Sequence, residues 1–207
     1  MIKKKGLLLV ISGPSGAGKG TVCKELLKRN PDFKLSVSAT TRAPREGEVD
    51  GESYFFLTKE KFSEMIGQGG FLEYAQIYSN FYGTPKGPVM KYLEEGSDVI
   101  LEIEMQGARQ VKEMYPEAVL IFVLPPSLEE LRNRLTTRGT ETQEQVNERL
   151  STSFEEIKQV KDYNYFIFNE NNKTTESAMI IENLIVAEKN KASRYEKAII
   201  KKFEEEL

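Results

Sequence analysis

The stretch Ser12-Gly-Pro-Ser-Gly-Ala-Gly-Lys-Gly-Thr21 decides the fold of this chain. It follows a short apolar run at residues 7–11, typical of a buried parallel strand, and precedes a helical pattern over residues 21–28. Glycines let the backbone curl so that successive N–H groups point inward at phosphate oxygens, and the helix N-terminus adds partial positive charge. A strand, a glycine-rich turn and a helix in this order indicate a P-loop that binds nucleotide phosphates.

The end of the motif departs from the strict pattern, in which Ser or Thr directly follows the lysine. Here Gly20 follows Lys19 and Thr21 comes next. The Gly-Lys-Gly-Thr ending is similar to that of nucleoside monophosphate kinases such as adenylate kinase, in which phosphates and water largely hold the metal. Thr21 is therefore the candidate metal contact, with Mg²⁺ otherwise held by phosphates and water. The residues expected to cradle the triphosphate are Gly13, Pro14, Ser15, Gly16, Ala17, Gly18, Lys19, Gly20 and Thr21.

Composition excludes several classes of function. The 207 residues include no histidine, no tryptophan and one cysteine, and 29 Lys and Arg stand against 32 Asp and Glu. Without histidine there is no Ser-His-Asp or Cys-His chemistry and no histidine metal site. The single thiol, Cys23, fits a reducing compartment and a place in the core. A net charge of −3 argues against a nucleic-acid partner. No run approaches the roughly 20 apolar residues that span a membrane, so we expect a soluble, cytoplasmic protein with no membrane partner.

Alternating strand and helix patterns predict an α/β fold, a P-loop core whose parallel sheet is flanked by helices. The further strands are expected over 99–103, 118–124 and 165–168, and the further helices over 86–95, 107–114 and 127–135. Residues 38–88 break this rhythm and predict an inserted, partly antiparallel subdomain of mixed α/β structure. Residues 127–158 are highly charged and suit a mobile helical lid, which leaves 1–37, 89–126 and 159–207 for the core.

The tail is expected to be a long helical pattern from residue 175 onward. Its apolar residues Tyr195, Ile199 and Phe203 recur at four-residue spacing, which places them on one helix face. That face can pack on the core or on another subunit, so the sequence is compatible with a monomer and with a homo-oligomer.

A second constellation lies in the inserted segment. Arg42 and Arg45 are three residues apart, and Tyr54 follows them. Two guanidinium groups and a phenol are well suited to bind one phosphate monoester, because arginine binds phosphate with two parallel hydrogen bonds. The alternative is a surface loop of solvated charges.

Six blocks of the chain, in order, resemble guanylate kinase. They are the P-loop, Ser-Ala-Thr-Thr-Arg-Ala-Pro-Arg-Glu-Gly-Glu at 38–48, Phe-Leu-Glu-Tyr-Ala at 71–75, Tyr-Gly-Thr at 82–84, Glu-Ile-Glu-Met-Gln-Gly at 102–107 and Arg-Gly-Thr-Glu at 138–141. The resemblance covers about residues 6 to 170. It implies ATP-dependent phosphorylation of GMP, and of dGMP, with Mg²⁺ and with 38–88 as the GMP-binding subdomain.

The resemblance also implies roles for single residues. It assigns the GMP phosphate to Arg42, Arg45, Tyr54 and Tyr82, and the base to Ser38, Glu73 and Thr84. A carboxylate at Glu73 can accept hydrogen bonds from both N1–H and the 2-amino group of guanine, a donor pair that adenine lacks.

Glu102 and Glu104 stand at the end of a predicted parallel strand, where such sheets bind ligands. They are expected on one face, contacting guanine or the waters of Mg²⁺, and the sequence leaves open which does which. The lid supplies Arg134, Arg138 and Arg149 at family arginine positions, where they would stabilise charge on the transferred phosphoryl group. Asn169 matches a position near the adenine of ATP.

The expected mechanism is direct in-line transfer between two bound nucleotides, with Lys19, Arg42 and the lid arginines as catalytic residues. Two other functions remain open at this point. Guanylate-kinase-like domains of scaffold proteins bind phosphorylated partners without catalysis, although such a domain need not keep the intact P-loop. A kinase for another nucleoside monophosphate would require that Glu73 and Thr84 fail to select guanine.

Overall fold

The core of the molecule is a parallel sheet, seen in a computed structural model that describes residues 4–136 and 143–207. Its five strands stand in the order β2-β7-β1-β8-β9, and every neighbouring pair is parallel. The strands are β1 (Leu8–Ser12), β2 (Lys34–Leu35), β7 (Val99–Glu102), β8 (Val119–Leu124) and β9 (Tyr165–Phe168). All of β1 is buried, as expected of a central strand covered on both faces.

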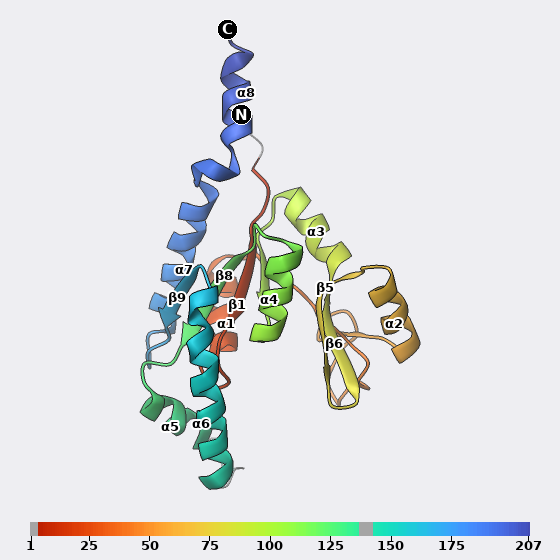
Figure 1. Cartoon of the computed structure of the whole chain (residues 1–207), viewed down its shortest axis with the longest axis vertical. Coiled ribbons are helices and arrows are strands. Elements are labelled where there is room, and N and C mark those ends of the chain that lie inside the picture. The colour runs from red at the N-terminus through yellow and green to blue at the C-terminus, as the bar shows by residue number, and fades with distance from the viewer. Residues whose placement is uncertain (1–3, 137–142) are drawn as a thin grey trace.

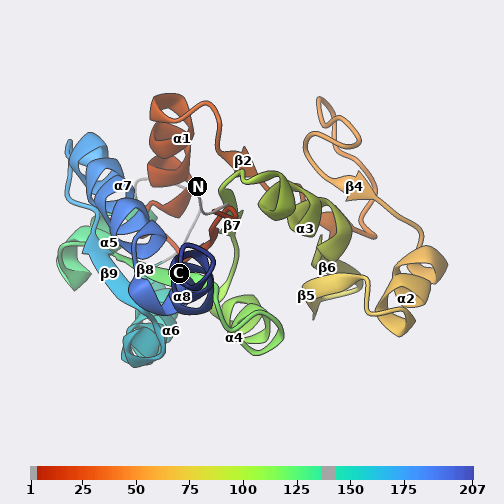
Figure 2. The ribbon, with the colours of Figure 1, turned by 90° about the horizontal axis from the view of Figure 1, so that it is seen from above.

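Helices cover both faces of this sheet, as Figure 2 shows from above. Helices α1 (Lys19–Arg29) and α7 (Thr174–Lys189) pack on the face that receives Leu9 and Ile11 of β1. Helices α3 (Lys86–Glu95) and α4 (Met105–Met114) pack on the opposite face, which receives Leu8 and Val10. This alternation is the two-residue period of a strand, and it confirms the α/β class predicted from the sequence. Cys23 is buried in the first of these layers.

The inserted segment forms a second sheet, set to one side of the first (Figure 2). Its order is β4-β3-β6-β5, with β6 antiparallel to both β3 and β5. The elements are β3 (Ala39–Thr40), β4 (Phe55–Phe56), helix α2 (Lys59–Gly67), β5 (Phe71–Ile77) and β6 (Asn80–Pro85). This part of the chain has a small core of its own around Ala39, Phe62 and Phe71.

The segment 127–158, expected to be a lid, contains two helices, α5 (Leu128–Thr136) and α6 (Gln143–Ile157), and the 3-10 turn η1 (Lys158–Asp162) follows it. They lie at one end of the molecule, and the tail projects from the other (Figure 1). The tail is two elements rather than one helix, because η2 (Ala192–Arg194) separates α7 from α8 (Glu196–Glu204). On α8, Ile199 and Phe203 are exposed and do not pack on the core, so an oligomer through this face stays a prediction.

One predicted boundary was wrong in a way that matters for the site. The strand expected over 99–103 ends at Glu102, and α4 begins at Met105 instead of residue 107. Glu104 is therefore the residue that precedes α4 rather than a strand residue. In the described part of the chain, no helix has both the length and the apolar content to cross a membrane.

Candidate active site

The loop between β1 and α1 has the backbone of a phosphate cradle. Gly13 and Gly18 have φ angles of 146° and 91°, a region that side chains other than glycine rarely enter. A Cβ atom on Gly13 would lie 2.2 Å from the carbonyl oxygen of Val123, and one on Gly18 would lie 2.2 Å from Nδ2 of Asn169. At both positions a side chain is therefore excluded twice, by the positive φ angle and by the atoms that a Cβ atom would meet.

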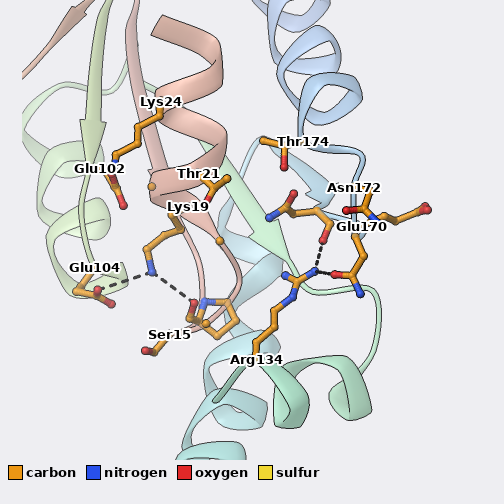
Figure 3. A pocket seen from close by; sticks show the side chains of 16 residues that line it. Ser15, Lys19, Thr21, Lys24, Glu102, Glu104, Arg134, Glu170, Asn172 and Thr174 are labelled. Atoms are coloured by element: carbon orange, nitrogen blue, oxygen red, sulfur yellow. Dashed lines mark hydrogen bonds and ion pairs between the residues drawn. The ribbon is translucent and has the colours of Figure 1, made fainter. Parts of the chain in front are cut away.

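Lys19 is the first residue of α1, and its ammonium group sits at the mouth of the loop. Its Nζ donates to the carbonyl oxygen of Gly13 at 2.6 Å and forms an ion pair with Glu104 at 3.7 Å. Figure 3 shows the lysine between Glu104 and the carbonyl oxygen of Pro14, to which Nζ also donates, at 3.4 Å. Phosphate oxygens are acceptors of the same kind, so a bound triphosphate can replace these contacts.

A cavity of about 620 Å³ opens above this loop. Eight of the residues assigned to ATP from the sequence line it: Pro14, Ser15, Gly16, Gly18, Lys19, Gly20, Thr21 and Asn169. Gly13 and Ala17 contribute from beneath through their carbonyl oxygens, which accept from Lys19 and from Asn169 Nδ2. The rest of the wall comes from Lys24, Glu102, Glu104 and Arg134, and from the loop after β9 with Thr174.

Arg134 joins three parts of this cavity. Its guanidinium donates to the carbonyl oxygens of Ala17, at 3.1 Å, and Asn169, at 2.8 Å, and to Oδ1 of Asn171, at 2.7 Å. Glu130, one turn earlier on α5, accepts from Nε at 2.9 Å. The side chain therefore ties α5 to the P-loop and to the loop after β9 (Figure 3).

The other lid arginines reach different parts of the chain. Arg149 of α6 donates to Oγ of Ser15 at 2.8 Å, which brings α6 against the P-loop. Arg138 lies outside the described residues. Helices α5 and α6 thus contact the P-loop, at Ala17 and Ser15 respectively.

Oxygen atoms suited to Mg²⁺ line the same cavity. Thr21 is exposed there, and Glu102 lies close enough to α1 that a Cβ atom on Gly20 would meet its Oε1 at 3.1 Å. Hydroxyl, carboxylate and phosphate oxygens are the ligands Mg²⁺ prefers. Across residues 4–136 and 143–207, no three His, Cys, Asp or Glu side chains are arranged to hold a metal ion by themselves.

Glu102 and Glu104 form a wall that two cavities share. Both line the P-loop cavity, and both also line a second cavity of about 740 Å³ that faces the inserted sheet. Desolvation raises the pKa of the Glu102 carboxyl, opposed by the charge of Lys19 and reinforced by that of Glu104. The sequence placed both residues in the ligand crevice, and the structure does too, although Glu104 arrives there from the start of α4.

The second cavity collects most of the residues assigned to GMP from the sequence. Besides the two glutamates, it is lined by Ser38, Tyr54, Glu73 and Tyr82. The rings of Tyr54 and Tyr82 meet edge to face with centroids 6.2 Å apart. The Arg42 guanidinium lies over the Tyr54 ring at 5.5 Å, which places a cation beside both phenols.

Arg42 is held by a residue to which the sequence reasoning gave no role. Glu48 accepts from Nη1 and Nη2 of Arg42 at 3.0 and 2.8 Å, and from the backbone N–H of Arg45 at 2.7 Å. The hydrogen bond from Arg42 and then that from Arg45 lower the pKa of the Glu48 carboxyl, so it stays ionised. The Arg45 side chain is exposed. The sequence feature that could have identified Glu48 is its place in the block 38–48, six residues after Arg42.

Glu73 and Thr84 form a buried pair on β5 and β6. Thr84 Oγ1 donates to Oε1 of Glu73 at 2.6 Å. Thr84 is 1% exposed and does not line the cavity, whereas Glu73 is 8% exposed and does. Thr84 therefore positions the Glu73 carboxylate rather than facing the cavity itself. Burial raises the pKa of Glu73, and the hydrogen bonds from Thr84 oppose that rise.

Further polar side chains in this cavity were not found from the sequence. Gln76, Arg109, Glu156 and Gln159 line it, from β5, α4, α6 and η1. Burial and the nearby charge of Glu104 raise the pKa of Glu156. No short motif joins residues so far apart along the chain, and only the packing of α4 and α6 around the cavity brings them together.

Comparisons with known proteins agree with this geometry. The family model of guanylate kinase matches residues 5–188. The guanylate kinase of Clostridioides difficile (strain 630) is 68% identical over 207 residues and all of both chains. That of Caldanaerobacter subterraneus subsp. tengcongensis is 53% identical over 206 residues, covering 100% of this chain and 99% of the relative. The crystal structure of guanylate kinase from Anaplasma phagocytophilum is similar at 35% identity and a TM-score of 0.71, covering 92% of this chain and 90% of that one. With a P-loop cavity and a Glu73 cavity divided by two carboxylates, and with relatives that match along its full length, this chain belongs to the guanylate kinase family.

Proposed function

We propose that the protein transfers the γ-phosphoryl group of ATP to GMP, and to dGMP, giving ADP and the guanosine diphosphate. The observation that carries this proposal is the shared wall of Glu102 and Glu104. A triphosphate on the P-loop and a monophosphate between Arg42, Tyr54 and Tyr82 would each extend toward that wall, so their phosphates would meet there. The assignment supports a division into a core, a GMP-binding subdomain over 38–88 and a lid over 127–158.

The acceptor needs no side-chain base, because a phosphate oxygen of GMP is already ionised at neutral pH. That oxygen forms a bond to the γ-phosphorus of ATP, and the bond from that phosphorus to the oxygen bridging to the β-phosphate breaks. Catalysis of this kind rests on positioning and on cations that stabilise charge on the transferred group. Lys19 would contact the terminal phosphates, and Arg134, Arg138 and Arg149 would supply further positive charge from the lid.

The acceptor subsite divides its tasks between two groups of residues. Arg42, Arg45, Tyr54 and Tyr82 would hold the GMP phosphate, with Glu48 keeping the Arg42 guanidinium in place. Ser38 and Glu73 would form hydrogen bonds with the guanine base, and Thr84 would orient the Glu73 carboxylate. Closure of the lid and the GMP-binding subdomain would exclude water, which would otherwise hydrolyse ATP.

Mg²⁺ would be bound chiefly by phosphate and water oxygens, with Thr21 and Glu102 as the nearest protein donors on the P-loop side. When bound, the ion neutralises charge on the β- and γ-phosphates. Asn169 would lie near the adenine of ATP, fixed by its hydrogen bond to the carbonyl oxygen of Ala17 at 3.0 Å.

A coupled phosphoryl-transfer assay with ATP tests the proposal across GMP, dGMP, AMP, CMP and UMP. We expect transfer to GMP and dGMP and little to the other three. Absence of transfer to every acceptor would point to a binding module, and a preference for AMP or UMP would point to another monophosphate kinase. The intact P-loop favours a kinase over a binding module, because a binding module need not keep it.

The same assay tests the role of Lys19. Lys19→Met removes the ammonium group that faces the terminal phosphates, and we expect it nearly to abolish turnover, a loss on the order of a thousandfold or more. Circular dichroism and the thermal midpoint establish that the variant is folded. Near-normal turnover in a folded Lys19→Met protein would contradict the assigned role.

A further inference from the structure

Gly107 stands where a helix would favour another residue. It is the third residue of α4, is buried, and has an ordinary helical conformation. Glycine inside a helix is less stable than alanine, because it loses more backbone entropy on folding. No positive φ requires a glycine here. The reason for its presence must therefore lie in the space beside it.

That space is limited by one side chain. A Cβ atom on Gly107 would lie 2.7 Å from Oε2, 3.1 Å from Cδ and 3.3 Å from Cγ of Glu73, and these are its three nearest atoms outside the helix. The contact at 2.7 Å is shorter than a carbon and an oxygen tolerate. Because the atoms in the way are the end of a side chain, the backbone could accept a methyl group if the carboxylate moved.

The elements on either side are held at a fixed spacing. Gln110, three residues further along α4, accepts from the backbone N–H of Tyr74 and donates to its carbonyl oxygen, both at 3.0 Å. The side-chain amide of Gln110 thus bonds to the edge of β5 as a neighbouring strand would, next to Glu73. A methyl group on Gly107 would therefore act on the Glu73 carboxylate rather than part α4 from β5.

The Glu73 carboxylate has little room to move without losing contacts. Its Oε1 accepts from Thr84, and the side chain is buried between that hydroxyl and α4. Displacement from Gly107 would weaken this hydrogen bond and change the direction in which the carboxylate faces the cavity.

We propose that Gly107 determines specificity for the acceptor base: its missing side chain keeps free the space in which the Glu73 carboxylate faces guanine. This inference rests on the proposed function. The carboxylate accepts from N1–H and from the 2-amino group, and two such bonds depend on its orientation. Gly107 is a positioning residue, because it acts through Glu73.

Inosine 5′-monophosphate is the acceptor that isolates this effect, because it keeps N1–H and lacks the 2-amino group. The experiment measures kcat and KM for GMP and for inosine 5′-monophosphate, KM for ATP, and the thermal midpoint. The proteins are wild type, Gly107→Ala and Gly87→Ala. Gly87 is the matched control, as the second residue of α3, where a Cβ atom would meet nothing within 4 Å.

We expect Gly107→Ala to fold with a midpoint close to that of the wild type, because the gain of alanine in the helix offsets the weakened hydrogen bond between Thr84 and Glu73. Its KM for GMP should rise about tenfold and its preference for GMP over inosine 5′-monophosphate should fall about tenfold, the effect of one weakened charge-assisted hydrogen bond. Its KM for ATP should stay within about twofold. Gly87→Ala should change none of these by more than about twofold.

A double-mutant cycle separates this role from a structural one. In a Glu73→Ala background, Gly107→Ala should change the preference between the two acceptors by less than about twofold, because the side chain that the methyl group displaces is gone. The inference fails if Gly107→Ala does not fold, keeps the wild-type preference, or has its full effect without the Glu73 carboxylate. A wild-type protein that does not phosphorylate GMP would instead overturn the proposed function, before any variant is compared.

Discussion

Glu73 combines two properties that rarely occur together in one carboxylate, namely near-complete burial and exposure of one edge to a large cavity. Burial favours the neutral form, and the hydrogen bonds from Thr84 favour the ionised one. Burial dominates, so the pKa lies above its ordinary value. The group that would read guanine is consequently sensitive to pH in a range where surface glutamates are already ionised.

This shift predicts the direction of a pH effect on GMP binding. As pH falls through the raised pKa, Glu73 takes up a proton and can no longer accept from both donors of guanine. We therefore expect KM for GMP to rise on the acid side, beginning at a higher pH than an unperturbed glutamate would give. The measurement is kcat/KM for GMP against pH, in wild type and in Glu73→Gln.

The variant supplies the control, because the phosphate of GMP titrates in both proteins while Glu73 titrates in one. Glu73→Gln should raise KM for GMP about 10- to 100-fold, the range for a lost hydrogen bond to a charged group. It should also lose the part of the acid limb that belongs to the carboxylate. Identical profiles in the two proteins would rule out Glu73 as the titrating group.

At this scale the sequence identified residues that line the cavities better than the residues that hold those side chains in place. Tyr54, Glu73 and Tyr82 face the predicted cavity, because their motifs specify residue types that bind. Glu48, Gly107 and the inward turn of Thr84 act on other side chains. Such pairings depend on distances across the fold, which spacing along the chain does not report.

The inserted subdomain is stabilised largely by three aromatic side chains from three of its elements. Phe62 of α2 stacks on Phe71 of β5 with centroids 4.3 Å apart and on Phe81 of β6 at 5.5 Å. Phe62 is fully buried and belongs to a small core separate from those of the parallel sheet. The strands that carry Glu73, Tyr82 and Thr84 thus depend on packing within this subdomain.

Phe62→Ala is expected to cost about 3–5 kcal/mol of stability, as for other buried phenylalanines. Because the loss falls on the subdomain, the dissociation constant of GMP should rise far more than that of ATP. Urea denaturation and calorimetric titration with the two nucleotides measure these effects. Cys23→Ala, a small change on the buried face of α1, serves as the comparison. Equal losses of GMP and ATP binding would contradict an independent subdomain core.

The long elements were predicted well and the short ones were not. The buried runs of β1 and β8 and the pattern of α3 span enough residues to be recognised. The sequence also predicted β9, although it predicted a buried strand and only Ile167 of the four residues is buried. Strands β2, β3 and β4 have two residues each, too few for any alternation to appear. Helix α2 lies in the segment 38–88, for which the sequence predicted mixed structure without placing a helix, and its Phe62 packs on β5 and β6.

Across the whole molecule, the two cavities meet because of strand order. Strands β1 and β7 are parallel neighbours, so the P-loop after β1 and Glu102 at the end of β7 emerge at the same edge of the sheet. The inserted sheet follows β2 on one side, and α6 comes from the other. The sequence predicted a ligand crevice at the end of the strand that carries Glu102, but not the order of the strands. The contacts of the lid with Ser15 and Ala17 required the structure.

The proposed function rests on direct transfer between two nucleotides across the wall of Glu102 and Glu104. The most direct test uses ATP whose γ-phosphorus is made chiral with oxygen isotopes and sulfur, with GMP as the acceptor. Configuration is then read at the β-phosphorus of the guanosine diphosphate product. A single in-line displacement predicts inversion at that phosphorus. Retention would show two successive displacements through a phosphorylated enzyme group and would contradict the account.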